Sequence, residues 1–189
     1  MRTTHHEGKE TSQGPSRRKP QDTQPQGSNV KVEPQREHHW LQKLVGEWTY
    51  EGEASMKPGA PPEKSSGTET VRSLGGLWIL AEGRSQMPDG SPATTVMTLG
   101  YDPQKKQYVG TFVGSMMTYL WLYHGALDAA GTMLSLETEG PSMAAEGKMA
   151  KYRDVIELKS DDHRVMTSHI LGDDGEWVGF MTATYRRRK

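Results

Sequence analysis

Apolar and polar residues alternate along most of the chain from residue 46 onward, which is the pattern of β-strands with one buried face. In the first such stretch Trp48 and Tyr50 share one side, while Glu47 and Thr49 share the other. Glycine, proline and aspartate mark the turns between stretches. The pattern predicts ten strands, at residues 46–54, 67–74, 77–86, 93–101, 107–114, 117–127, 132–139, 150–159, 163–171 and 176–186.

The connections between these strands are too short to hold crossover helices, so neighbouring strands are expected to pair in antiparallel hairpins. A sheet of this length with one wet face removes its exposed edges by closing on itself. The sequence therefore predicts an all-β fold, a closed antiparallel up-and-down barrel of about ten strands. A barrel of this size is wide enough to enclose a small ligand.

Two segments precede the strands. Residues 37–45 place four apolar side chains at the spacing of a short helix with one apolar face, and Gly46 can end that helix. Residues 1–36 are rich in glutamine, serine, threonine, proline and charge, and they hold too few apolar side chains to offset the entropy of ordering. We expect a disordered polar N-terminal tail over 1–36 and one barrel domain over 37–189.

Composition narrows the function classes. The chain has no cysteine, which excludes disulfides, thiolate metal sites and cysteine nucleophiles. Its formal net charge is −1, and no basic face indicates a nucleic-acid-binding protein. The sequence shows neither an apolar run of membrane-helix length nor a signal peptide. These features predict a cytoplasmic protein that binds neither nucleic acid nor membranes.

Longer strings point to a family. The segments GEWTYEGE, GTETVRSLGGLWILAEG, MTLGYDPQKKQYVG and KYRDVIELKSDDHR resemble the bacterial domain-of-unknown-function family 1579 (DUF1579). The Gly-x-Trp at residues 46–48 also resembles the opening of lipocalin-like (calycin) barrels. The resemblance implies a lipocalin-like barrel and brings no established activity. It further implies that Trp48 closes one barrel end and packs against a terminal cation, either Arg186 or Arg187, of which we assign Arg186.

Charged residues within apolar strands are the first candidates for chemistry. Glu82 and Arg84 share one face of their strand, Arg153 lies beside the apolar Val155, and Asp154 falls on the side of an apolar row. Inside a barrel, such groups would need partners or would have shifted pKa values, and they could orient the polar head of a ligand. On the outer face they would form weak cross-strand ion pairs instead.

Methionine and histidine add further candidates. Methionines, Met97 among them, are unusually frequent and can line an adaptable apolar pocket or simply fill a core. Trp121 shares a face with Tyr119 and Tyr123, which is either interior or an exposed stripe. By analogy with nitrobindin-type barrels, His169 could hold a haem iron if it points inward, although we expect no cofactor and no metal site.

These observations favour a small-molecule carrier or sensor for an apolar or amphipathic ligand. One alternative is a barrel enzyme, of isomerase or lyase type, that uses Glu82 or Asp154 with His169; an enzyme is the less favoured reading. Another is a structural barrel that self-associates as a homo-oligomer. The candidate ligand-binding residues are Glu82, Arg84, Met97, Trp121, Arg153 and His169.

Overall fold

The computed structural model describes residues 32–55 and 61–189. Most of the predicted tail therefore lies outside the described residues, and its disorder stays a prediction. The described chain holds one short helix and ten strands. These are α1 (Arg36–Gln42), β1 (Gly46–Ala54), β2 (Glu63–Leu74), β3 (Trp78–Gln86), β4 (Pro92–Asp102), β5 (Gln107–Gly114), β6 (Trp121–Leu127), β7 (Met133–Pro141), β8 (Met149–Ser160), β9 (His163–Leu171) and β10 (Trp177–Arg187).

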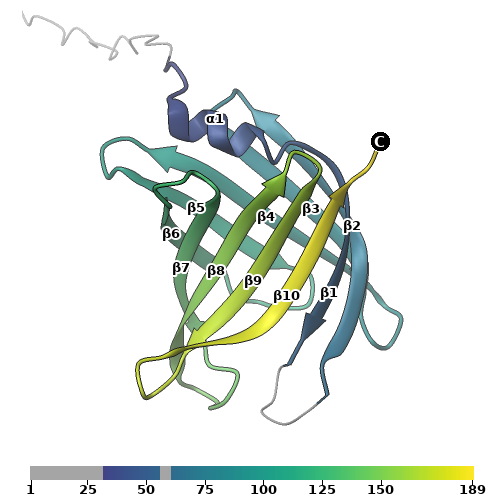
Figure 1. The fold of residues 1–189 in the computed structure, drawn as a ribbon. Coiled ribbons are helices and arrows are strands. Elements are labelled where there is room, and N and C mark those ends of the chain that lie inside the picture. The colour runs from purple at the N-terminus through teal and green to yellow at the C-terminus, as the bar shows by residue number, and fades with distance from the viewer. Residues whose placement is uncertain (1–31, 56–60) are drawn as a thin grey trace, which may run out of the picture. The chain divides into compact units, whose positions relative to one another are not determined.

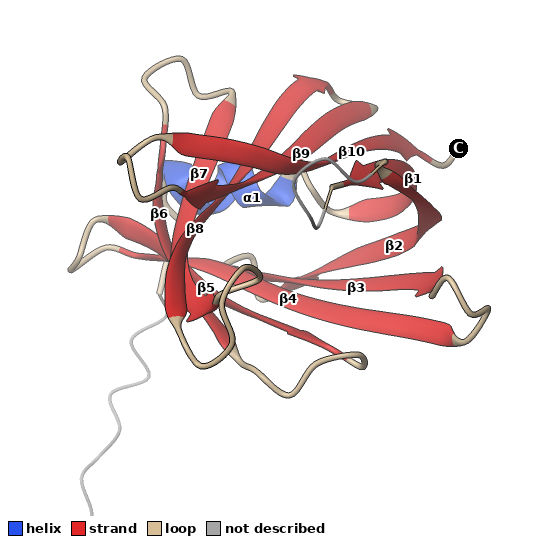
Figure 2. Ribbon diagram, turned by 90° about the horizontal axis from the view of Figure 1, so that it is seen from below, coloured by secondary structure: helices blue, strands red, loops and turns tan. Residues whose placement is uncertain are grey.

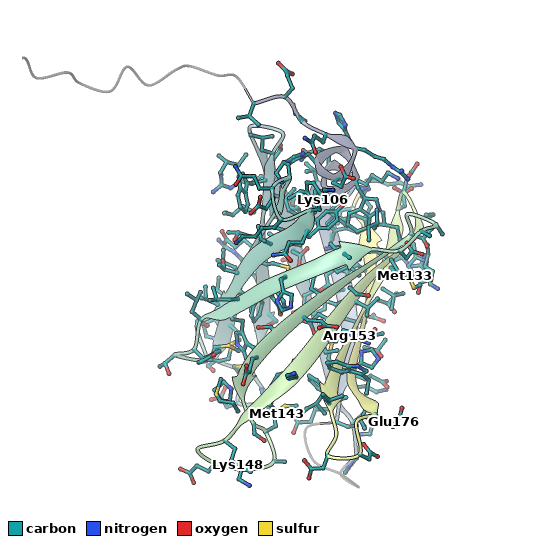
Figure 3. The ribbon with its side chains drawn as sticks, turned by 90° about the vertical axis from the view of Figure 1, so that its left-hand side faces the viewer. Lys106, Met133, Met143, Lys148, Arg153 and Glu176 are labelled. Atoms are coloured by element: carbon teal, nitrogen blue, oxygen red, sulfur yellow. The ribbon has the colours of Figure 1, made fainter. Side chains whose placement is uncertain are left out.

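The strands form a closed barrel, which confirms the predicted fold class (Figure 1). Each strand pairs antiparallel with the next one along the chain, and β10 returns to pair with β1. Figure 2 looks into the barrel from below, and α1 lies across the far end. We call the opposite end, which carries the β3–β4, β5–β6, β7–β8 and β9–β10 turns, the mouth. Met143, Lys148 and Glu176 lie near it (Figure 3).

Two strand boundaries differ from the prediction by more than two residues. β2 begins at Glu63 rather than 67, because the added residues are polar and exposed, and so carry no signal of alternation. β6 begins at Trp121 rather than 117, because Met116, Met117 and Leu120 lie in the preceding connection. At the start of β2 the strand residues are polar, and before β6 apolar residues lie outside the strand. Hydrophobic periodicity therefore misplaces both boundaries.

The α1 end of the barrel is a packed apolar core. Leu41 and Leu44 have no exposed surface and pack with Trp48, Leu99 and Tyr108 inside the barrel. The helix is joined to the barrel by polar contacts as well, since the Trp40 indole donates to the Gly131 carbonyl at 2.9 Å. This end is therefore closed by side chains. No helix among the described residues is long and apolar enough to cross a membrane.

Candidate functional site

Toward the mouth, the inner face of the barrel is not fully buried. Five large side chains point inward here and pack against the core, yet each keeps part of its surface exposed. They are Met97, Phe112, Trp121, Met166 and Met181, and their neighbours in the sequence point outward. Toward the α1 end, Trp48, Ile79, Leu99 and Leu134 are fully buried instead, although Tyr101, Leu127 and Leu158 also keep part of their surface exposed. Surface accessible to solvent therefore remains on the inner face of the barrel toward the mouth. Met97 and Trp121, two predicted ligand-binding residues, face this interior.

One wall of this region is built from small residues. Across β1 to β5 the strand registers bring together inward positions that are glycine, alanine, serine or threonine, with the Tyr50 ring lying over Gly67 and the Met116 sulfur over Gly114. The opposite wall carries aromatic rings. We call the two walls together the lower lumen. Its small residues are Gly52, Ser65, Gly67, Gly83, Ser85, Ala93, Thr95 and Gly114, and its large ones are Met97, Phe112, Trp121, Tyr152, Met166 and Met181.

Trp121 is held in place on the aromatic wall. Its ring meets that of Tyr152 edge to face at 5.1 Å between centroids. It lies against Gly140, where a Cβ atom would stand 2.1 Å from the ring, so only glycine leaves room for it. Its indole nitrogen donates to the Met117 sulfur at 3.1 Å. The sequence left this face open between interior and surface, and the structure places it inside.

A buried ion pair lies between the lower lumen and the α1 end. Arg164 of β9 donates from a guanidinium nitrogen to the Glu69 carboxylate of β2, with side chains only 6% and 15% exposed. The guanidinium also lies over the rings of Trp48 and Tyr185, at 4.7 and 4.2 Å from their centroids. Its Nε is buried with no hydrogen-bond partner. The two charges neutralise each other inside the barrel.

A second buried polar group centres on Asp154 of β8. Its carboxyl accepts hydrogen bonds from the Tyr123 hydroxyl and from Ser168. Burial raises the pKa of Asp154, although both hydrogen bonds act in the opposite direction. Burial and the adjacent carboxyl also raise the pKa of Tyr123 well above its usual value. On β7, whose register places Leu136 opposite Asp154, the buried Thr138 hydroxyl has no partner.

Trp48 occupies the position expected of it, but its cation is not the one assigned. The ring is fully buried, and Arg187 lies over it at 4.2 Å. Arg187 also donates to the carbonyls of Val45 and Lys43, which ties the end of β10 to the segment before β1. The choice of Arg186 was wrong: it faces outward and is exposed, because the register pairs Trp48 with Arg187.

Three predicted charged residues lie on the outer face of the barrel. Glu82 and Arg84 form an ion pair at 2.8 Å, with side chains 39% and 74% exposed. Arg153 pairs with Glu137 at 2.6 Å, lies 4.0 Å from the Trp177 ring centroid and sits midway along the barrel wall in Figure 3. Of the two alternatives that the sequence left open for Glu82, Arg84 and Arg153, the structure therefore shows outer-face ion pairs and no position in the lumen. Successive side chains of a strand point to opposite faces of the sheet. The residues next to Glu82, Arg84 and Arg153 in the sequence point inward, so these three point outward.

His169 also faces outward, since the inward side chains of β9 are Arg164, Met166, Ser168 and Ile170. One nitrogen of the His169 ring lies 3.4 Å from the Arg153 carbonyl oxygen. This position does not fit an axial ligand for a haem inside the barrel. Within the described ranges, no group of three or more histidine or acidic side chains could hold a metal ion.

The two larger of the grooves found among the described residues lie on the outside of the barrel. One, of about 510 Å³, lies between α1 and the β4–β5 and β6–β7 turns and is lined by Trp40, Lys43 and Lys106 among others. The other, of about 1120 Å³, runs over the outer faces of β1, β2 and β10, between Thr49, Lys64, Thr184 and their neighbours. Neither contains a predicted ligand-binding residue.

Comparisons with known proteins place the chain. The model of the family described as "Protein of unknown function (DUF1579)" matches residues 33–187. The chain belongs to this family. No curated protein matches the DUF1579 chain.

Solved structures similar to this DUF1579 chain share its fold at low identity. One is the crystal structure of Rv2717c from M. tuberculosis, with 13% identity and a TM-score of 0.58; the match covers 83% of this chain and all of that one. The redesigned β-barrel mFAP1 bound to DFHBI has 16% identity and a TM-score of 0.41, covering 81% of this chain and all of that one. The first likeness supports the barrel fold alone.

The polar groups inside the barrel were mostly missed by sequence reasoning. Arg164 and Glu69 were not considered, and Asp154 was only a conditional candidate. One signal was available for Glu69: Val71 is the single buried apolar residue of β2, and Glu69 shares its side of the strand. No comparable signal existed for Arg164, because both sides of β9 mix apolar and polar residues.

Proposed function

We propose that this DUF1579 chain binds a small apolar or amphipathic molecule in the lower lumen and acts as a carrier or sensor. The observation that carries the proposal is the partial exposure of large side chains that face inward toward the mouth. In a barrel with a filled interior these side chains would be buried, as Trp48, Leu99 and Leu134 are toward the α1 end. A ligand entering from the mouth would cover them.

The chemistry of the lower lumen supports an apolar ligand. Methionine side chains are flexible and polarisable, so Met97, Met166 and Met181 can adapt to varied shapes. Phe112 and Trp121 add flat apolar surface. Mostly apolar walls with a few polar groups are typical of small-molecule sites. The polar groups of the barrel interior include Asp154 and the Arg164–Glu69 pair, and these lie at the inner end of this region, away from the mouth.

The placement of the candidate acids and bases favours binding over catalysis. The enzyme alternative needs Glu82 or Asp154 beside His169. Glu82 and His169 lie on the outer face, whereas Asp154 is inside. General acid–base catalysis requires both groups within reach of one reacting position, and the barrel wall separates these.

The test is a fluorescence titration with N-phenyl-1-naphthylamine, an uncharged dye that brightens in apolar surroundings. Thr95→Trp places a large side chain on the small-residue wall and is expected to weaken dye binding by about tenfold or more. Thr94→Trp, one residue away on the exposed outer face of β4, is the matched control and should bind like the unmodified protein. Absence of binding, or equal affinity in both variants, would refute the proposal.

Self-association remains a second candidate because one apolar patch is exposed on the outer wall. Val113 and Leu122 lie on the neighbouring strands β5 and β6 and are 41% and 61% exposed, and Leu120 is 50% exposed beside them. Contiguous exposed apolar surface often marks an interface. Light scattering coupled to gel filtration tests this candidate: a dimer that Leu122→Glu converts to a monomer would support it.

A further inference from the structure

The charges inside the barrel are already matched to one another. Arg164 is paired with Glu69, and Asp154 is held by two hydroxyl donors. Two other inward charges are accounted for outside the lower lumen. Arg187 is bound to backbone carbonyls at the α1 end, and Glu63 is exposed to solvent at the first position of β2.

A charged head at the inner end of the lower lumen would therefore find no free counter-charge among the described residues there, since the exposed Glu63 lies at the mouth. A carboxylate bound to Arg164 would lie beside the buried Glu69 carboxylate and be repelled by it, and an ammonium would need Asp154 to give up its proton in a desolvated site. Burial already raises the pKa of Asp154, which favours its neutral form. Burying a charged head without a partner opposes binding, whereas an uncharged head has no such cost.

The barrel does hold an unused hydrogen-bonding group. Thr138 is 5% exposed and lies on the inner face of β7, and its hydroxyl is buried without a partner. Its register partner on β8 is Tyr152, whose own hydroxyl donates to the Pro141 carbonyl at 2.7 Å. A buried hydroxyl without a partner is unfavourable, and a ligand atom that can accept or donate would satisfy it.

We infer that the ligand of the lower lumen is an uncharged amphipathic molecule whose hydroxyl or carbonyl end bonds Thr138 near Asp154, with its apolar part toward the mouth. This inference rests on the proposed function and specifies the class of ligand. It excludes fatty carboxylates and alkyl amines as preferred ligands. Medium-chain alcohols and ketones fit the same space without a charge.

The experiment compares three ten-carbon compounds with different heads, 1-decanol, decanoate and decylamine, by displacement of N-phenyl-1-naphthylamine at pH 7.5. Decanol is expected to bind at least about tenfold more tightly than either charged compound. A preference for decylamine would mean that Asp154 is ionised, and a preference for decanoate would mean that Arg164 is available. Either result would overturn the inference.

Thr138→Val provides the second measurement. It keeps the shape of the side chain and removes the hydroxyl, so decanol affinity should fall about fivefold while dye affinity stays unchanged. Thr167→Val, on the outer face of β9, is the control and should change neither affinity. If the dye binds but none of the three compounds displaces it, the inference fails and the proposed function stands. If the dye does not bind, both fail.

Discussion

Removing Arg164 should reveal the cost of burying Glu69. In Arg164→Met the apolar stem is retained, but the Glu69 carboxylate, only 15% exposed, loses its counter-charge. Breaking a buried pair on one side costs roughly 3–5 kcal/mol. Losing the contacts of the guanidinium with the Trp48 and Tyr185 rings adds about 1 kcal/mol. We therefore expect the unfolding free energy to fall by about 4–6 kcal/mol.

The second substitution in the cycle separates charge burial from lost packing. Adding Glu69→Gln to Arg164→Met removes the unpaired charge, and the double variant should recover about 2–3 kcal/mol of the loss. The outer pair supplies a matched control with the same two residue types. Arg84→Met should cost less than about 0.5 kcal/mol, because Arg84 and Glu82 are both well exposed to solvent.

Urea unfolding followed by tryptophan fluorescence measures all these variants, provided that the dependence of the free energy on urea is the same in each. A loss below about 1 kcal/mol in Arg164→Met would show that the pair is not desolvated. A double variant no more stable than Arg164→Met alone would assign the loss to packing. Either result would refute the reasoning that charge burial dominates here.

Three further predictions concern the barrel interior. Because the pKa of Asp154 is raised in the folded protein, its contribution to stability is present below about pH 4 and is lost as pH rises through that raised pKa. Asp154→Asn should remove this decline, as measured by urea unfolding between pH 4 and 7.5. Thr138→Val removes an unpaired buried hydroxyl, so it should raise the unfolding free energy by about 1 kcal/mol and the melting temperature by about 2–4 °C. A lower melting temperature in calorimetry would mean that the hydroxyl has a partner. Arg187→Gln should cost about 2–3 kcal/mol in chemical denaturation through its lost carbonyl contacts and its contact with Trp48, whereas Arg186→Gln should stay within about 0.5 kcal/mol; equal losses would contradict the register.

The sequence was sufficient for the architecture because a barrel of hairpins repeats one local rule. Alternation and turn residues predicted all ten strands, and antiparallel closure followed from the short connections. On β8 the alternation also indicated the inner side, since Tyr152 and Ile156 share it with Asp154. On β9 it did not: Val165 and Leu171 made the outer side look as apolar as the inner one, so the side on which His169 lies stayed open.

The polar interior could not be predicted, for a different reason. Arg164 and Glu69 lie 95 residues apart on strands that are not paired with each other, so neither hairpin spacing nor alternation relates them. Their contact depends on the curvature of the closed sheet and on the length of the arginine side chain. The error between Arg186 and Arg187 has a simpler cause. The two residues are adjacent on one strand, and a shift of one residue moves a side chain from the inner face to the outer one.

The pairing of β1 with β10 also has a consequence for how the chain is made. Every other strand pairs with its immediate successor, so those hairpins can form as soon as both strands have left the ribosome. The last pair joins the first and final strands, and until β10 emerges both β1 and β9 present unpaired edges. A protein cut short before Trp177 would keep those edges open, and we expect it to aggregate rather than fold as a smaller barrel.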